Sequence, residues 1–115
     1  MENRSYLGEF ELMLLLAVIH LGEEAYGVPI SREIERHRKR DVSVGSVYAA
    51  LERLEAKGLV NSSLGSPTPE RGGKAKRYFR ITKKGLRQVQ ETRRILTSLW
   101  HAIPDYKFEL QQERI

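Results

Sequence analysis

Apolar residues recur at helical spacing near the start of the chain and predict a helix over residues 8–21. One predicted face consists of Phe10, Met13, Leu14, Ala17, Val18 and Leu21. Much of the opposite side is also apolar, at Leu12, Leu15, Leu16 and Ile19. A helix that is apolar nearly all round must be covered on two sides. In so small a domain one cover is the core, and we expect the other to be a second subunit.

A second helix is predicted to start near Tyr26 and to turn Ile30 and Ile34 toward the core at i, i+4 spacing. Pro29 is tolerated in its first turn, because the N–H that proline lacks would be unpaired there in any case. The pattern leaves the end of this helix undefined, since residues 36–40 contain no helix breaker.

A third helix has clearer limits, with Ser43 as the predicted N-cap and Gly58 as the glycine just past its C-terminus. Its predicted core positions are Val47, Leu51 and Leu54. Residues 59–64 then form a predicted strand and residues 75–81 a return strand, joined by a loop over 65–73 that carries Pro67 and Pro69. The fold class that follows is mainly α with a small β-hairpin, a winged helix-turn-helix.

The last predicted helix starts at the N-cap Thr82 and continues to about Ile103, where Pro104 ends it. A heptad-like seam runs along it through Leu86, Val89, Arg93, Leu96, Trp100 and Ile103. At 1.5 Å per residue this helix is about 30 Å long and must project beyond a compact core. We expect residues 1–81 to form the DNA-binding domain, and residues 82–115 to form a dimerisation helix and tail.

Charge along the chain is uneven, which tells more than the net charge of +5. Residues 71–87 carry eight cationic side chains and no acidic one, whereas residues 1–26 carry one arginine and five glutamates. A basic face beside an acidic one suits a polyanionic partner, although it is also compatible with a solvated basic surface. There is no cysteine, no signal-peptide pattern and no apolar run long enough for a membrane span, so we expect a soluble cytoplasmic protein that binds no membrane.

The third helix is the predicted recognition helix. Its DNA-facing residues would be Ser43, Val44, Gly45, Ser46 and Tyr48. Short side chains allow the helix N-terminus to approach DNA closely, where backbone N–H groups and the helix dipole favour phosphate. Ser43 also serves as an N-cap, and Tyr48 has half-buried packing as its alternative role.

The wing of this fold would contribute cations next to the paired glycines 72 and 73. These predicted contacts are Arg71, Lys74, Lys76 and Arg77. Glycines permit close approach to the DNA backbone, and the cations release counterions from it. A plain solvated hairpin is the alternative.

Catalysis has little support in the sequence. His20, His37 and His101 lie without metal-ligand spacing, and no paired acids or phosphate-binding loop accompany them. We expect His20 to pack in the interior and the other two histidines to be exposed. The chain is therefore expected to be no enzyme and to hold no metal or cofactor.

Trp100 is the only tryptophan and lies on the predicted seam. A large anchor in a dimer interface is one role for it. The alternative is that two copies of Trp100, with Leu96 nearby, flank a cavity where a flat apolar effector stacks.

The chain resembles the PadR family of bacterial transcriptional regulators. The resemblance covers most of residues 7–100 and rests on Tyr26-Gly27, on the stretch from Gly45 to Glu55, and on the stretch from Tyr78 to Gly85. It implies a homodimeric repressor whose recognition helices enter successive major grooves of a near-palindromic operator. Ser43, Ser46 and Tyr48 match the family's DNA-facing helix, and Lys74, Lys76 and Arg77 match its wing. It further implies the compact subgroup with one C-terminal dimerisation helix, and a response to small aromatic or apolar compounds.

These observations predict a sequence-specific transcriptional regulator, with double-stranded DNA, a second copy of itself and a small aromatic or apolar effector as partners. The alternative is a winged-helix protein-interaction module whose basic face docks an acidic partner. A small-molecule-binding dimer with vestigial DNA contact is a further alternative.

Overall fold

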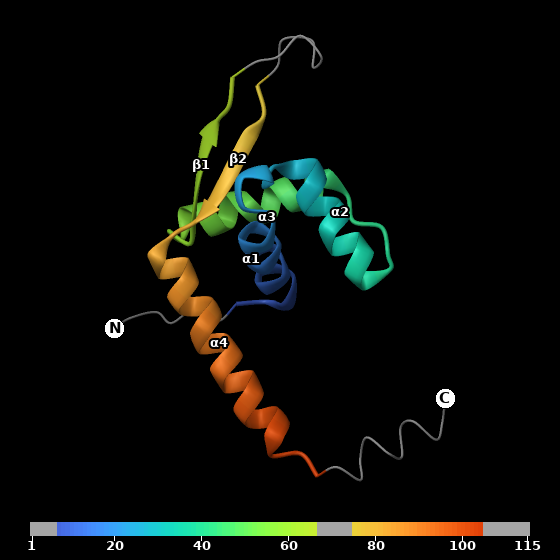
Figure 1. Ribbon diagram of the computed structural model, residues 1–115, viewed down its shortest axis with the longest axis vertical. Helices are drawn as coiled ribbons and strands as arrows, with labels where there is room; N and C mark the ends of the chain where they lie inside the picture. The colour runs from blue at the N-terminus through green and yellow to red at the C-terminus, as the bar shows by residue number, and fades with distance from the viewer. Residues whose placement is uncertain (1–6, 67–74, 105–115) are drawn as a thin grey trace.

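The computed structural model describes residues 7–66 and 75–104. The elements follow the order α1 (Glu9–Leu21), η1 (Gly22–Glu24), α2 (Gly27–Arg38), α3 (Val44–Ala56), β1 (Val60–Leu64), β2 (Arg77–Ile81) and α4 (Lys83–His101). Helices α1 to α3 gather in the middle, while the β1–β2 hairpin and α4 project in opposite directions (Figure 1). The mainly helical fold with a two-stranded antiparallel hairpin is as predicted.

Helix α1 is the central element of the core. It contacts α2, α3, β2 and α4, and its buried residues are Leu14, Leu15, Ala17 and Val18. Leu15 was expected on the outward side but is fully buried, because elements pack around more of α1 than the sequence pattern suggested. Leu16 and Ile19 remain exposed, so the apolar surface of α1 that a second subunit could contact is narrower than predicted.

The end of α2, which the sequence left open, is set by backbone conformation. Lys39 adopts the left-handed region (φ 62°), and its N–H donates to the carbonyl of Glu35 at 2.7 Å. The Glu35 carboxylate then accepts from the N–H of Val42 at 2.8 Å. Ser31, the buried polar residue of the core, donates its hydroxyl to the carbonyl of Val42 at 2.6 Å. These bonds fix the turn that places the start of α3.

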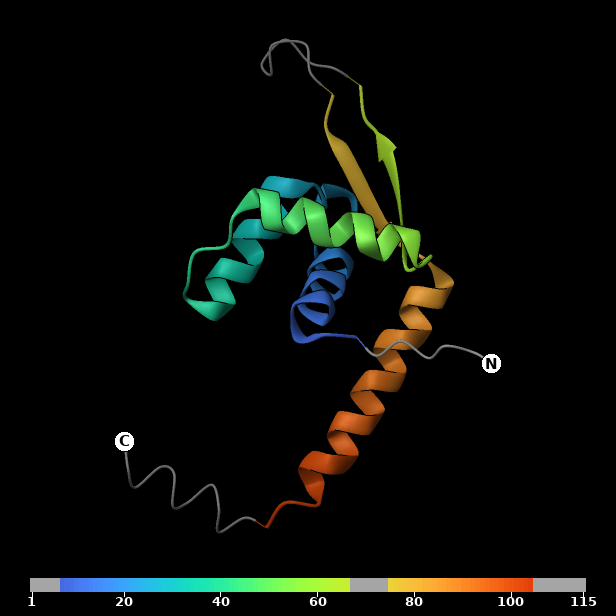
Figure 2. The same cartoon turned by 180° about the vertical axis from the view of Figure 1, so that it is seen from behind.

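Helix α3 follows its prediction closely. Ser43 caps it by accepting a hydrogen bond from the N–H of Ser46 at 3.0 Å, and Gly58 just past its end has φ 80°. The predicted core positions Val47, Leu51 and Leu54 are all fully buried. Seen from behind, α3 lies across the molecule and ends at the base of the hairpin (Figure 2).

The hairpin pairs Val60 with Ile81 through Leu64 with Arg77 in antiparallel register. Phe79 anchors it in the core, and its N–H donates to the carbonyl of Ala25 at 2.8 Å. The return strand starts at Arg77, two residues later than predicted. The hairpin is thus fastened at its base to the turn before α2.

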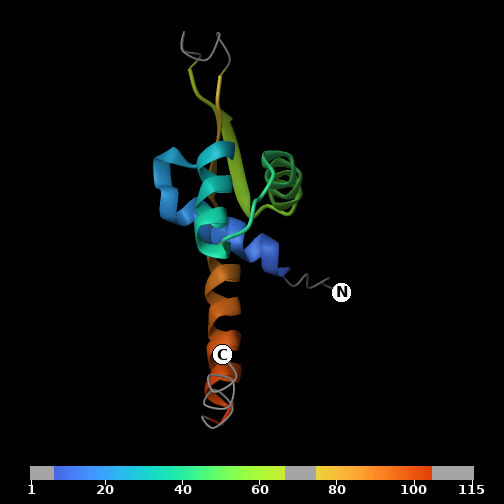
Figure 3. The same cartoon turned by 90° about the vertical axis from the view of Figure 1, so that its right-hand side faces the viewer.

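Helix α4 begins as predicted at Thr82, whose hydroxyl oxygen accepts from the N–H of Gly85 at 3.0 Å. Its first turns pack on the core through Gly85 and Val89, and the rest extends away from it (Figure 3). Val89 was predicted for the dimer seam but is 93% buried in its own chain, because the start of α4 lies against α1. Within the described residues, no helix is both long and apolar enough to cross a membrane.

Candidate nucleic-acid interface

The N-terminus of α3 is an exposed surface made of small residues. Ser43, Val44, Gly45 and Ser46 are all solvent-exposed there. The hydroxyl groups of Ser43 and Ser46 lie 2.8 Å apart and share a hydrogen bond beside the cap. A helix N-terminus with free amides and no bulky side chain can be approached closely by a phosphate group. Four of the five predicted recognition residues therefore lie together.

Tyr48, the fifth, is half-buried and performs a packing role. Its ring lies 6.1 Å from the ring of Phe79, measured between centroids. It also lies against Gly27 at the start of α2, where a Cβ atom would meet the tyrosine ring at 2.5 Å. A packing role for Gly27 was not predicted from the Tyr26-Gly27 pair. Any side chain at position 27 would collide with the Tyr48 ring, so the packing requires glycine there.

Two of the predicted wing cations, Arg71 and Lys74, lie outside the described residues. Lys76 is described, and its side chain lies over Tyr26. The ammonium group is 4.4 Å from the centroid of the Tyr26 ring and donates to the phenolic oxygen at 3.3 Å. Tyr26 in turn meets Tyr78 edge to face, with ring centroids 5.3 Å apart. Lys76 is therefore held partly within the protein.

Arg77, the remaining wing prediction, is bound by acidic side chains of α3. Its Nη2 lies 2.9 Å from Glu55 Oε1, and its Nη1 lies 3.6 Å from a carboxylate oxygen of Glu52. Its Nε donates to the hydroxyl of Ser62 at 3.1 Å. The contacts of Arg77 with Glu52, Glu55 and Ser62 were not predicted from the sequence. The signal was available, because Glu52 and Glu55 are spaced i, i+3 on the helix that leads directly into the hairpin.

The remaining predicted positions lie along α4 and just past it, because the helix ends at His101, two residues before the predicted end at Ile103. Among the predicted seam and effector residues, the exposed ones are Leu86, Arg93, Leu96, Trp100 and Ile103. Ile95 and Leu99 are exposed as well and had not been included. Trp100 and Leu99 are 62% and 61% exposed, which is unusual for large apolar side chains on one helix.

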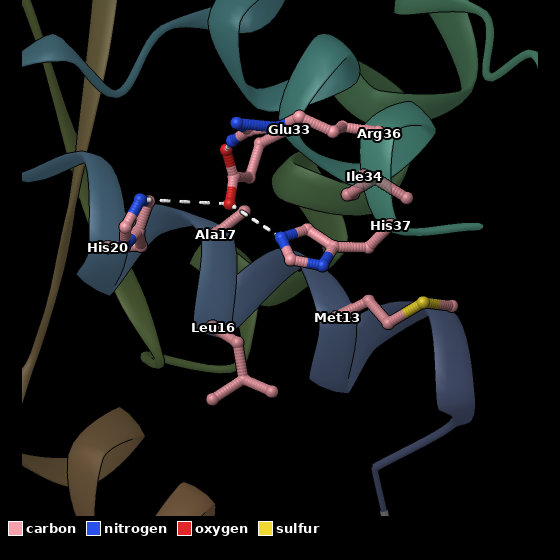
Figure 4. Close-up of a pocket in the computed structure, with 8 residues that line it drawn as sticks. All are labelled: Met13, Leu16, Ala17, His20, Glu33, Ile34, Arg36 and His37. Atoms are coloured by element: carbon pink, nitrogen blue, oxygen red, sulfur yellow. Dashed lines mark hydrogen bonds and ion pairs between the residues drawn. The ribbon is translucent and has the colours of Figure 1, made fainter. Parts of the chain in front are cut away.

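A pocket of about 570 Å³ lies between α1 and α2 and was not predicted (Figure 4). Its apolar lining comes from Met13, Leu16, Ala17 and Ile34. On its polar side Glu33 pairs with Arg36, while His20 and His37 approach the same carboxylate from α1 and α2, at 3.8 and 3.2 Å. His20 is therefore exposed and not packed inside, contrary to expectation.

The carboxyl group of Glu33 has a lowered pKa. Burial by itself would raise that pKa, but the hydrogen bond and charge of Arg36, together with His20 and His37, outweigh the burial. Across the described residues, no group of three or more His, Cys, Asp and Glu side chains is arranged to hold a metal ion.

The chain has a core of three helices, and the third of them, α3, has an exposed and capped N-terminus. Together with the adjoining two-stranded hairpin, this arrangement defines a winged-helix protein. The chain belongs to the transcriptional regulator PadR-like family, whose sequence model matches residues 15–91. The family is one of transcriptional regulators, so the chain is not an enzyme.

Individual relatives agree with this assignment. The chain is 40% identical over 76 residues to transcriptional regulator Rv3488 of Mycobacterium tuberculosis, and the match covers 66% of each chain, just under two thirds of that relative's length. Its fold matches the crystal structure of a PadR-like transcriptional regulator from Bacillus cereus with a TM-score of 0.65. The two sequences are 28% identical, and the match covers 81% of this chain and 85% of that one. A PadR-like transcription factor from Bacteroides fragilis shares the fold, with 22% identity and a TM-score of 0.68 over 81% of this chain and 84% of that one.

Proposed function

We propose that this regulator binds an operator in double-stranded DNA as a homodimer and represses transcription by occluding a promoter. The observation that carries the proposal is the exposed N-terminus of α3, where Ser43, Gly45 and Ser46 leave the helix end open. Backbone amides and the positive end of the helix dipole favour phosphate there. Serine hydroxyls at the same place donate to phosphate oxygens and fix the register on the duplex. Val44, which is exposed beside them, suits apolar contact with a thymine methyl group.

The proposed dimer rests on exposed apolar side chains of two helices. Leu16 and Ile19 are exposed on α1, and Leu96, Leu99 and Trp100 are exposed on α4. The second half of α4 extends beyond the core (Figure 1), and within residues 7–66 and 75–104 the leucine side chains of this stripe stay exposed. Contiguous apolar surface of this kind marks association sites. A second copy supplies the same surfaces by two-fold symmetry.

Release by a small effector completes the proposed mechanism. Trp100 and Leu96 lie on the outer half of α4, where two copies would face each other across the dimer axis. An aromatic or apolar compound bound there would change the spacing of the two recognition helices. We expect such a compound to alter Trp100 fluorescence and to lower operator affinity; unchanged affinity at saturating compound would contradict release.

The test of operator binding is a titration at several salt concentrations, with the DNA upstream of the protein's own reading frame and a scrambled duplex. Selective binding with a steep salt dependence is the expected result. Ser46→Asp is a suitable variant, because an acidic residue in the first turn suits the helix dipole but repels phosphate. Ser98→Asp makes the same change on exposed α4 and is the control. Equal weak binding to both duplexes would contradict the proposal and favour an acidic protein partner instead.

A further inference from the structure

One carboxylate joins three elements at the base of the hairpin. Glu55, in the last turn of α3, accepts from the N–H of Ser62 at 3.2 Å and from the Ser62 hydroxyl at 2.9 to 3.0 Å. The same carboxylate accepts from Nη2 of Arg77 at 2.9 Å. Ser62 belongs to β1 and Arg77 to β2, so both strands are bound to the recognition helix through Glu55.

The guanidinium of Arg77 completes the same network from the other side. Its Nε donates to the Ser62 hydroxyl at 3.1 Å, and the group lies 5.3 Å from the centroid of the Phe79 ring. Charge-assisted bonds to a planar guanidinium restrict orientation as well as distance. Arg77 is thus oriented toward α3 in the unbound protein.

We propose that Glu55 is a positioning residue that sets the angle between the hairpin and α3, and thereby the selectivity of this regulator for its operator. The proposal rests on the function proposed above. A two-stranded hairpin is only marginally stable without packing, and here it extends beyond the core (Figure 2). The hairpin and the helix tip must meet one duplex together, so their relative orientation decides whether both fit. The Glu55–Ser62–Arg77 network holds that orientation before DNA arrives, which lowers the ordering cost of binding.

A positioning role for Glu55 and a purely electrostatic role predict opposite changes in DNA affinity when its charge is removed. Glu55→Gln removes a negative charge and loosens Arg77, so charge alone predicts tighter binding to any DNA. A positioning role predicts weaker selective binding instead. Glu52→Gln is the matched control, because it removes the same charge from the same helix one turn earlier. The Glu52 side chain is 65% exposed and lies 3.6 Å from Arg77, farther than the 2.9 Å between Glu55 and Arg77.

The experiment measures affinity for the operator and for scrambled DNA with the wild-type protein, Glu55→Gln and Glu52→Gln at several salt concentrations. We expect Glu55→Gln to lower the ratio of the two affinities about tenfold, with the salt dependence unchanged, and Glu52→Gln to preserve the ratio. A ratio preserved in Glu55→Gln, or lowered equally in both variants, would overturn the positioning role.

A measurement without DNA separates this inference from the proposed function. Amide hydrogen exchange at Ser62 and along the hairpin is compared among the same three proteins, with the thermal midpoint of each as a check on folding. Faster exchange in Glu55→Gln alone is expected, because the Ser62 N–H loses its charged acceptor. Unchanged exchange would overturn the positioning role whatever the DNA result. If the wild-type protein does not select its operator while the exchange difference is present, the proposed function fails and the network remains a purely structural clamp.

Discussion

At the scale of single residues, Gly85 shows how closely α4 approaches the hairpin. A Cβ atom at this position would overlap the backbone carbonyl oxygen of Leu59 and would lie 2.9 Å from a side-chain atom of Ile81. A backbone oxygen at the start of the hairpin cannot rotate away as a flexible side chain can. The glycine is therefore required by packing, because the first turn of α4 lies directly on the connection between α3 and β1.

Gly85→Ala is accordingly expected to destabilise the fold by about 1–3 kcal/mol, the usual cost of overpacking. Urea unfolding followed by circular dichroism measures the difference. Gly45→Ala is the control, because the nearest atom to a Cβ there is 4.0 Å away, at Ser43. In that helix alanine is expected to be neutral or stabilising by up to about 1 kcal/mol. Equal losses in the two variants would refute the packing argument.

A second residue-scale effect concerns Glu33 and pH. The pKa of this carboxyl lies below its ordinary value of 4.5: burial opposes the shift, while Arg36, His20 and His37 together outweigh it. A carboxyl whose folded pKa is lowered stabilises the fold above its unfolded pKa. That contribution is lost as the pH falls through the folded value. The pairing therefore acts at neutral pH and disappears in acid.

Glu33→Gln is expected to lower stability at pH 7 by less than about 1 kcal/mol, since the partners of Glu33 are exposed. The deficit should vanish well below pH 4.5. Urea titrations at pH 7 and at pH 3 measure it, with Glu24→Gln in the neighbouring exposed turn as the control. A deficit of the same size at both pH values would show that the charge of Glu33 is not its cause.

At the scale of elements, the helix caps and the inward face of α3 could be predicted from the sequence, whereas the packing of one element on another could not. The caps Ser43 and Thr82 and the core positions of α3 were found, because each depends on residues within one or two helical turns. The burial of Leu15 and Val89 was missed, since it depends on which elements surround α1 and the start of α4. The ion pair of Arg77 with α3 was not predicted, because a sequence shows the charge of Arg77 but not which acidic side chains lie beside it.

Among the elements, α4 allows a direct test of the proposed dimer. Leu99→Glu is expected to convert a dimer into monomers at micromolar concentration, because it places a charge in the exposed apolar stripe. Light scattering measures the mass. Leu64→Glu makes the same substitution at an exposed leucine of β1 and should leave the mass unchanged. A monomeric wild-type protein, or a dimer that survives Leu99→Glu, would contradict the proposed use of α4.

At the scale of the whole molecule, the arrangement of the parts matters more than any single contact. The hairpin and the exposed half of α4 project in opposite directions from the core (Figure 3). In a dimer joined through α4, the two-fold axis would pass between the two copies of α4. The two recognition helices would then both lie toward the same side of one duplex. A pair of identical helices related by a two-fold axis fits two half-sites in successive major grooves.

The geometry of a rigid dimer predicts an operator with half-sites about 34–36 Å apart, centre to centre. Inserting five base pairs between the half-sites turns one of them to the opposite face of the duplex, so only one recognition helix can bind. Affinity should then fall to that of an isolated half-site, whereas the same insertion outside the operator should change nothing. Binding that tolerates the internal insertion would mean that each copy binds DNA independently. The apolar surface of α4 would then have to serve something other than the spacing of two recognition helices.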